Sequence, residues 1–188
     1  FFLIICFAIT LYEWYMMSKK KNYHFIGYPF LVFSFYSAFS LRNNFDDESL
    51  WVFSFIILIC ISTDIGGYLF GKILKGPKLT KLSPNKTYSG MMGGYFFSFL
   101  VIYFFMEYSE FLFNQITKWT PQAFIYIILI SSISQIGDIT ISYFKRLSKI
   151  KDTGKIIPGH GGILDRIDGI IFAIPFSYIM FTFNILNW

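Results

Sequence analysis

The chain has 188 residues, of which 55% are hydrophobic, 22% aromatic and only 14% charged. A soluble domain of this size carries about 25% charged residues, so the composition excludes an ordinary soluble domain and indicates an all-α, polytopic integral membrane protein. Its apolar runs are continuous, which excludes a membrane barrel, because barrel strands alternate apolar and polar residues. Cys6 and Cys60 lie inside apolar runs, and we interpret them as small buried hydrophobic residues rather than a disulfide or metal pair.

Six apolar segments follow one another along the chain: Phe1–Met17, Phe25–Leu41, Leu50–Phe70, Met91–Phe105, Ala123–Ile141 and Gly169–Leu186. A helix needs about 20 residues to cross a bilayer, so the sequence predicts about six transmembrane helices in a single domain, with the second and fourth extending into their flanks. The chain starts without Met in an apolar run, as a fragment lacking N-terminal helices would. No small-residue cleavage site precedes Lys19, which disfavours a removable signal peptide.

Positive charge is concentrated in every second connection between these segments. Of the 16 Lys and Arg residues, 14 follow the first, third or fifth segment, and the other two are Arg42 and Lys118. Cytoplasmic connections of membrane proteins carry the excess of Lys and Arg. We therefore expect these three connections in the cytoplasm, and the net charge of +5 requires no nucleic-acid partner.

Two acidic residues lie near the predicted cytoplasmic ends of apolar segments. Asp64 lies in the third segment and Asp138 in the fifth, and an ionisable residue at membrane depth is costly and by default functional. The alternative for Asp64 is a shallow, solvated position. Asp138, Ser142 and Lys145 share one helical stripe. The alternative for Asp138 is a structural ion pair with Lys145 or Arg146, and the cost of a carboxylate at membrane depth favours Asp138 as a metal ligand.

The glycines around Asp64 and the connection after the third segment each have two interpretations. Gly66, Gly67 and Gly71 either belong to a site or allow close packing of helices through small residues. The segment from Ser83 to Thr87 offers hydroxyl groups and the Lys86 ammonium, which suit phosphate or ribose. The alternative is a basic connection that only determines topology.

The most unusual stretch runs from Ser142 to Asp168 and gathers cations, carboxylates and glycines between two apolar segments. Asp165 and Asp168 are three residues apart, so on one helical turn their carboxylates face the same side. The backbone at Gly161 and Gly162 can approach a ligand closely because glycine has no Cβ. Carboxylates that hold a divalent metal, beside cations that neutralise phosphate oxygens, are typical of phosphate chemistry.

This stretch resembles the C-terminal motif of the phosphatidate cytidylyltransferases, also called CDP-diacylglycerol synthases. The matching positions are Ser142, Lys145, Arg146, Lys151, Asp152, Pro158, Gly159, His160, Gly161, Gly162, Asp165, Arg166 and Asp168. A second motif of that family is matched by Ser83, Pro84, Lys86, Thr87 and Gly90, whereas Asn85, Tyr88 and Ser89 depart from it. The resemblance covers the chain from Asp64 onward.

The resemblance implies transfer of a cytidylyl group from CTP to phosphatidate, giving CDP-diacylglycerol and pyrophosphate. We expect the metal site to consist of Asp138 and Asp165, which hold Mg²⁺, with Asp168 nearby. Three carboxylates leave room for a second cation. His160 is expected to position phosphate or fix the glycine loop rather than act as a base. The expected phosphate-binding cations are Lys86, Lys145, Arg146 and Arg166. The other expected substrate contacts are Asp64, Ser83, Thr87, Ser142, Gly161 and Gly162.

Three alternatives are weaker. A CTP-dependent polyprenol kinase shares substrates but should lack the full motif. A CDP-alcohol phosphotransferase would need Asp168–Gly169 to begin a longer acidic pattern, which the following apolar residues do not continue. An ion-coupled transporter would place Asp64 and Asp138 near the bilayer midplane. We expect a multi-pass protein of the inner (cytoplasmic) membrane, and a homo-oligomer is compatible with the sequence.

Overall fold

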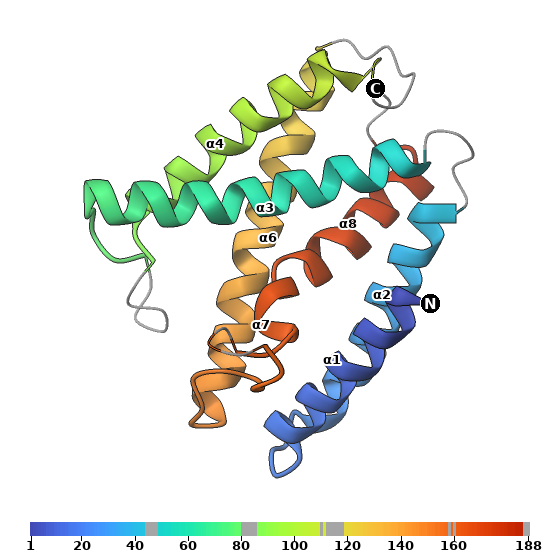
Figure 1. The fold of residues 1–188 in the computed structure, drawn as a ribbon, viewed down its shortest axis with the longest axis vertical. Coiled ribbons are helices and arrows are strands. Elements are labelled where there is room, and N and C mark those ends of the chain that lie inside the picture. The colour runs from blue at the N-terminus through green and yellow to red at the C-terminus, as the bar shows by residue number, and fades with distance from the viewer. Residues whose placement is uncertain are drawn as a thin grey trace.

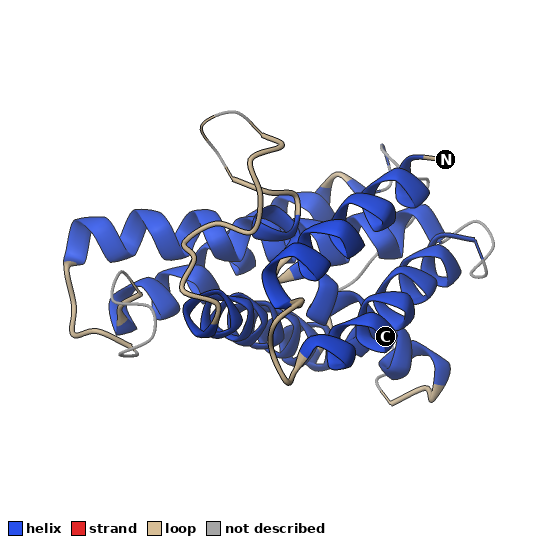
Figure 2. Cartoon of the chain, turned by 90° about the horizontal axis from the view of Figure 1, so that it is seen from below, coloured by secondary structure: helices blue, strands red, loops and turns tan. Residues whose placement is uncertain are grey.

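The structure, a computed structural model, describes residues 1–43, 49–79, 86–109, 111, 119–157, 159 and 161–185. Within these residues every regular element is a helix and there is no strand, as Figure 2 shows. The elements are α1 (Phe2–Ser18), the 3₁₀ helix η1 (His24–Ile26), α2 (Gly27–Asn43), α3 (Ser49–Leu74), α4 (Tyr88–Glu107), α6 (Pro121–Leu147), α7 (Leu164–Ile167) and α8 (Ile170–Thr182). The predicted all-α class is confirmed.

Each of the six predicted apolar segments forms a helix. Four are long and apolar enough to cross a membrane: His24–Asn43, Ser49–Leu74, Tyr88–Glu107 and Pro121–Leu147. The second and fourth segments extend into their flanks, as expected. The other two helices are shorter, with 17 residues in α1 and 13 in α8. At 1.5 Å per residue, α8 is about 20 Å long, less than the hydrocarbon core of a bilayer. The protein is a multi-pass membrane protein.

Threonine side chains define where α4 and α6 begin. Thr87 accepts a hydrogen bond from the Gly90 backbone N–H at 3.0 Å, and Thr120 accepts one from Ala123 at 3.2 Å. Both threonines have extended backbone conformations that fit the N-cap position. Pro121 follows Thr120 at a position where its missing N–H costs nothing. Thr87 therefore defines the end of α4 that borders the candidate site. Thr120 defines the start of α6, far along the helix from Asp138 and Lys145.

Glycines allow α3 and α4 to cross closely. A Cβ atom added to Gly66 would lie 2.5 Å from the Gly93 carbonyl oxygen, and one added to Gly90 would lie 2.7 Å from the Gly67 carbonyl oxygen. Such distances leave no space for a side chain, so the small-residue packing interpretation is confirmed for Gly66. Gly67 lines a pocket, and an added Cβ there would lie 3.7 Å from the Gly90 carbonyl oxygen. This crossing holds the start of α4 against the α3 turn that carries Asp64.

Two apolar clusters form the interior. One joins α3, α4, α6 and α8 through fully buried residues that include Phe55, Ile102 and Tyr126. The other joins α1, α2 and α6 to the α7–α8 region through residues that include Trp14 and Leu164. Because the second cluster includes α7, the first helix of the chain packs beside the motif-bearing stretch.

The ends of the long helices fall into two groups. In Figure 1, α1, α3 and α6 end toward the lower and left part of the molecule, where the three lysine-rich connections begin. The C-terminal ends of α2, α4 and α8 lie toward the upper right. Lysine-rich and lysine-poor connections thus leave the helices at opposite ends of the molecule.

Candidate active site

The last three turns of α6 present the predicted stripe of polar side chains. The Ser142 hydroxyl donates to Asp138 Oδ1 at 3.3 Å, one helical turn away. One turn further on, the Lys145 ammonium donates to Asp165 Oδ1 at 2.8 Å. Lys145 therefore connects α6 to the stretch that precedes α8.

Asp165 is surrounded by hydrogen-bond donors. Its Oδ1 atom accepts from Lys145, and its Oδ2 atom accepts from the backbone N–H groups of Thr153 at 2.8 Å and Gly162 at 2.9 Å. Burial alone would raise the pKa of Asp165, but the Lys145 ammonium and the two N–H groups outweigh it and lower the pKa below its usual range. Asp165 is therefore an ionised carboxylate that fastens together two parts of the loop.

Glycine is required where this loop closes on Asp165. Gly161 has φ +85°, a left-handed conformation that other residues rarely adopt. A Cβ atom at Gly161 would also lie 2.7 Å from Asp165 Oδ2. The glycines of the motif thus bring the backbone onto the carboxylate, and Gly162 contributes a donor to it.

Asp168 follows α7 directly and is 7% exposed. Small residues of α6 bring it close to that helix: a Cβ atom at Gly137 would lie 2.7 Å from the Asp168 carbonyl oxygen, and one at Gly169 would overlap the Ser134 hydroxyl. Gly137 immediately precedes Asp138. This close contact places the Asp168 backbone against the turn of α6 that carries the Asp138 carboxylate.

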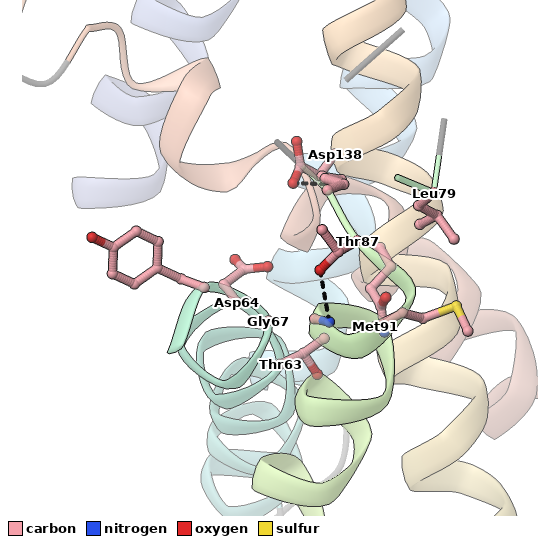
Figure 3. Close-up of a pocket in the computed structure, with 11 residues that line it drawn as sticks. Thr63, Asp64, Gly67, Leu79, Thr87, Met91 and Asp138 are labelled. Carbon is pink, nitrogen blue, oxygen red and sulfur yellow. Dashed lines mark hydrogen bonds and ion pairs between the residues drawn. The ribbon is translucent and has the colours of Figure 1, made fainter. Parts of the chain in front are cut away.

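Carboxylates and cations from separate parts of the chain line one polar cavity of about 280 Å³. Its lining residues are Asp64, Asp138, Lys145, Asp152, Asp165, Arg166 and Asp168. Asp64 and Asp138 also line a neighbouring pocket of about 300 Å³ between α3, α4 and α6, together with Lys86, Thr87 and Gln135. Figure 3 shows Asp64, Thr87 and Asp138 around this pocket. The two spaces therefore meet at two acidic side chains.

Negative charge is concentrated where the two spaces meet. Burial, and then the charge of Asp138, raise the pKa of the Asp168 carboxyl to about 8, against the opposing effect of Lys145. The charge of Asp64 also raises the pKa of Asp168. Lys86 forms an ion pair with Asp138 Oδ2 and so neutralises part of this charge. A bound cation would be stabilised here by the same carboxylates.

The donor set fits a hard divalent cation, which prefers carboxylate oxygen ligands. Asp138, Asp165 and Asp168 all line the polar cavity. In the described part of the chain, however, no three His, Cys, Asp or Glu residues form a group that could hold a metal ion. Three of the about four acceptor positions of Asp165 are already occupied by donors. Any ion held here would therefore draw mainly on Asp138 and Asp168.

The other predicted site residues have different positions. Arg166 lines the polar cavity, and Thr87 both caps α4 and lines the neighbouring pocket. Arg146 is exposed, and its guanidinium donates to the Ile150 carbonyl at 3.4 Å, outside the residues that line the cavity. Ser83 and His160 lie outside the described residues.

The structure brings four further residues to this region: three that sequence reasoning did not single out, and Asp152, which it named as a motif position without a role. Asp152 lines the polar cavity, while Thr63 and Gln135 line the neighbouring pocket. Glu13 of α1 is 1% exposed and accepts hydrogen bonds from the motif-bearing loop. Its signal was an acidic residue inside an apolar segment, the same feature that singled out Asp64.

Comparison with known proteins assigns the family. A sequence model of the Cytidylyltransferase family matches residues 1–184, nearly the whole chain. The chain belongs to the cytidylyltransferase family. The match includes the first two helices, which carry none of the motifs identified above.

Several bacterial relatives named phosphatidate cytidylyltransferase are similar over most of the chain. The Staphylococcus saprophyticus protein is 35% identical over 170 residues, which is 88% of this chain and 64% of that protein. The Bacillus subtilis protein is 33% identical over 189 residues, covering 94% and 66%. The Rickettsia bellii protein is 36% identical over 190 residues, covering 95% and 78%. The chain thus spans just under two thirds of the length of the first two relatives.

Proposed function

We propose that this family member transfers the cytidylyl group of CTP to phosphatidate, giving CDP-diacylglycerol and pyrophosphate. The observation that carries the proposal is the polar cavity, where Lys145 and Arg166 lie beside the carboxylates Asp138, Asp165 and Asp168 at the end of apolar helices. One substrate is water-soluble and the other is a lipid, which suits a polar site on membrane-spanning walls. The name of the bacterial relatives, phosphatidate cytidylyltransferase, supports the same reaction.

In the proposed reaction, a phosphate oxygen of phosphatidate attacks the α-phosphorus of CTP. A bond forms between them, and the bond from the α-phosphorus to the bridging oxygen breaks, so pyrophosphate leaves. Phosphatidate is already anionic at neutral pH, so the attack needs no base. The protein therefore contributes positioning and charge stabilisation, as is general for phosphoryl transfer.

Residue roles follow from their places. Lys145 is held by Asp165 at the wall of the polar cavity, where it can neutralise a transferring phosphate. Arg166 lines the same cavity and is assigned to the leaving pyrophosphate. Lys86 lies where the two spaces meet and is assigned to the nucleotide phosphates. Arg146 is exposed and does not line the cavity, and we assign it only to phosphate that extends beyond the cavity.

Asp138 and Asp168, with Asp165 beside them, are the residues that we propose hold Mg²⁺. When bound, the ion supplies positive charge for the transferring group. We propose Asp64 as a ligand of a second cation, because it lines both spaces with Asp138. We further propose that the lysine-rich connections face the cytoplasm and that the protein resides in the inner membrane, because positive connections remain inside.

The test uses the purified chain in detergent with phosphatidate, Mg²⁺ and CTP labelled at either the α- or the γ-phosphorus. Asp165→Asn is compared with Lys20→Gln, which removes one exposed charge far from the motif-bearing stretch in sequence. We expect α-label to enter the lipid phase with the wild type and Lys20→Gln, and transfer to be lost with Asp165→Asn or EDTA.

Entry of γ-label in place of α-label would overturn cytidylyl transfer and indicate a lipid kinase. A folded wild type that binds CTP but moves neither label into lipid would also overturn the proposal.

A further inference from the structure

Glu13 lies in α1, more than a hundred residues before the motif-bearing loop, and is 1% exposed. Both of its carboxylate oxygens accept hydrogen bonds from that loop. Oε1 accepts from the Ile163 backbone N–H at 3.0 Å, and Oε2 accepts from the Leu164 backbone N–H at 2.7 Å and the Thr153 hydroxyl at 3.1 Å. A buried carboxylate whose partners belong to one loop holds that loop in place.

A second carboxylate, that of Asp165, also joins the segment at Thr153 to the segment at 162–164. Asp165 Oδ2 accepts from the backbone N–H groups of Thr153 and Gly162. Two carboxylates therefore join the segment at Thr153 to the segment at 162–164. Asp165 is itself tied to α6 through Lys145, whereas Glu13 ties the same backbone to α1.

The backbone of the loop packs closely against the carboxylate of Glu13. A Cβ atom at Gly154 would lie 2.6 Å from Glu13 Oε1, and one at Gly162 would lie 2.5 Å from the same atom. The α1 helix is also fixed to α6, because the Ser148 hydroxyl donates to the Met17 carbonyl at 2.8 Å. The position of Glu13 is therefore determined from both sides.

We propose that Glu13 is a positioning residue for the transfer reaction, acting through the backbone of residues 163–164 rather than by contact with substrate. These residues immediately precede Asp165, Arg166 and Asp168, which line the polar cavity. Loss of the Glu13 acceptors releases two backbone N–H groups and frees this segment to shift. A displacement of about 1 Å at reacting groups can cost about 10²-fold in rate. The inference rests on the proposed function, and it makes the first helix part of the catalytic unit.

The test compares Glu13→Gln, Thr153→Val and their double variant in the full chain. Glutamine keeps the size of the side chain but presents an NH₂ group to the loop's N–H donors. Thr10→Val is the matched control, since Thr10 is also buried in α1 but donates only to its own helix, at Cys6. We measure kcat, KM for CTP and the Mg²⁺ concentration for half-maximal rate, together with amide hydrogen exchange over residues 161–168.

We expect Glu13→Gln to lower kcat and raise the half-maximal Mg²⁺ concentration, each by about 10- to 100-fold, with KM for CTP within about twofold of the wild-type value. The KM for CTP should change little because Lys86, which is assigned to the nucleotide, lines the neighbouring pocket and contacts Asp138 rather than the loop that Glu13 holds. Exchange should accelerate at the Ile163 and Leu164 amides. Thr153→Val should have a smaller effect and add little to Glu13→Gln, because both remove parts of one network.

Wild-type kcat and Mg²⁺ dependence in Glu13→Gln would overturn the inference, as would equal losses in Thr10→Val. If Glu13→Gln fails to fold, Thr153→Val carries the test, and unchanged kinetics and exchange there would overturn it. If the wild type transfers no cytidylyl group, the proposed function fails separately. Amide exchange then still decides whether Glu13 fixes this segment.

Discussion

Carboxylates in two neighbouring regions of this molecule differ in how many hydrogen bonds they accept from the protein. In the loop region, Glu13 and Asp165 each accept three hydrogen bonds from the protein. In the cavity region, Asp64, Asp138 and Asp168 share few donors, and their charges act on one another. Carboxylates of the first kind stabilise a backbone conformation. The carboxylates of the cavity region repel one another, and a cation or a cationic substrate complex can reduce this repulsion. Such an arrangement is typical of active sites.

The largest expected effect separates the two regions by opposite changes in stability. Asp168→Asn should lower kcat/KM for CTP by at least about 10²-fold. The thermal unfolding midpoint should stay unchanged or rise, because burial and the charge of Asp138 both disfavour the charged form of the carboxyl that is removed. Asp165→Asn should lower both activity and the unfolding midpoint, because Lys145 and two N–H groups lose their carboxylate partner. A lower midpoint in Asp168→Asn than in Asp165→Asn would contradict the distinction.

A second expected effect concerns Lys86, the cation that partly neutralises the cavity region. Lys86→Gln should raise KM for CTP by about 10-fold, since hydrogen bonds to charged groups contribute about 1.5–3 kcal/mol. Lys72→Gln is the matched control: it removes the same charge from an exposed lysine at the end of α3, whose ammonium lies near the Tyr68 hydroxyl. Equal changes in steady-state KM for the two variants would assign Lys86 only a general electrostatic effect.

Local sequence patterns predicted the parts of the molecule that local physics determines. Continuous apolar runs predicted the six longer helices of the described residues, because backbone hydrogen bonds in a bilayer are satisfied within a helix. Helical spacing predicted the Asp138–Ser142 contact. A close helix crossing was one of the two interpretations of Gly66, and the structure supports it there. These features depend on neighbours in sequence or on one residue type.

Contacts between remote segments were not predictable in the same way. Glu13 was visible as an acid in an apolar run, but its partners lie 140 to 151 residues away and depend on how α1 packs. Spacing and resemblance suggested that Asp165, with Asp138, holds the metal ion and that Asp168 lies nearby. Tertiary contacts differentiate Asp165 from Asp168, because the loop backbone closes on Asp165 and α6 packs against the backbone at Asp168.

A third, smaller effect tests whether the cavity region takes up a cation. Mg²⁺ at about 100 times its dissociation constant should stabilise the wild-type fold by about 2.7 kcal/mol. The shift in unfolding midpoint should be reduced in Asp168→Asn and reversed by EDTA in the wild type. In Glu13→Asp, a variant in the loop region, Mg²⁺ should still raise the unfolding midpoint. The increase should saturate at a higher Mg²⁺ concentration than in the wild type. Equal shifts at equal Mg²⁺ in the wild type and Asp168→Asn would place the ion elsewhere.

The smallest expected effect tests how the cavity region is built on α3. Gly66→Ala should destabilise the fold by about 1–3 kcal/mol, because its Cβ would lie 2.5 Å from the Gly93 carbonyl oxygen. Gly67→Ala is the matched control: its Cβ would approach nothing closer than the Gly90 carbonyl oxygen at 3.7 Å, so its stability should stay within about 0.5 kcal/mol of wild type.

These two substitutions add the same methyl group to adjacent residues of one helix, so helix propensity cancels between them. Denaturation in mixed micelles measures the difference, and CTP kinetics show whether it reaches Asp64, two residues before Gly66. If Gly66→Ala is as stable as Gly67→Ala, the close crossing does not hold α3 in place. If it is less stable but fully active, Asp64 keeps its position independently of the crossing. Loss of both stability and activity in Gly66→Ala alone would show that backbone packing, rather than further hydrogen bonds, positions this carboxylate.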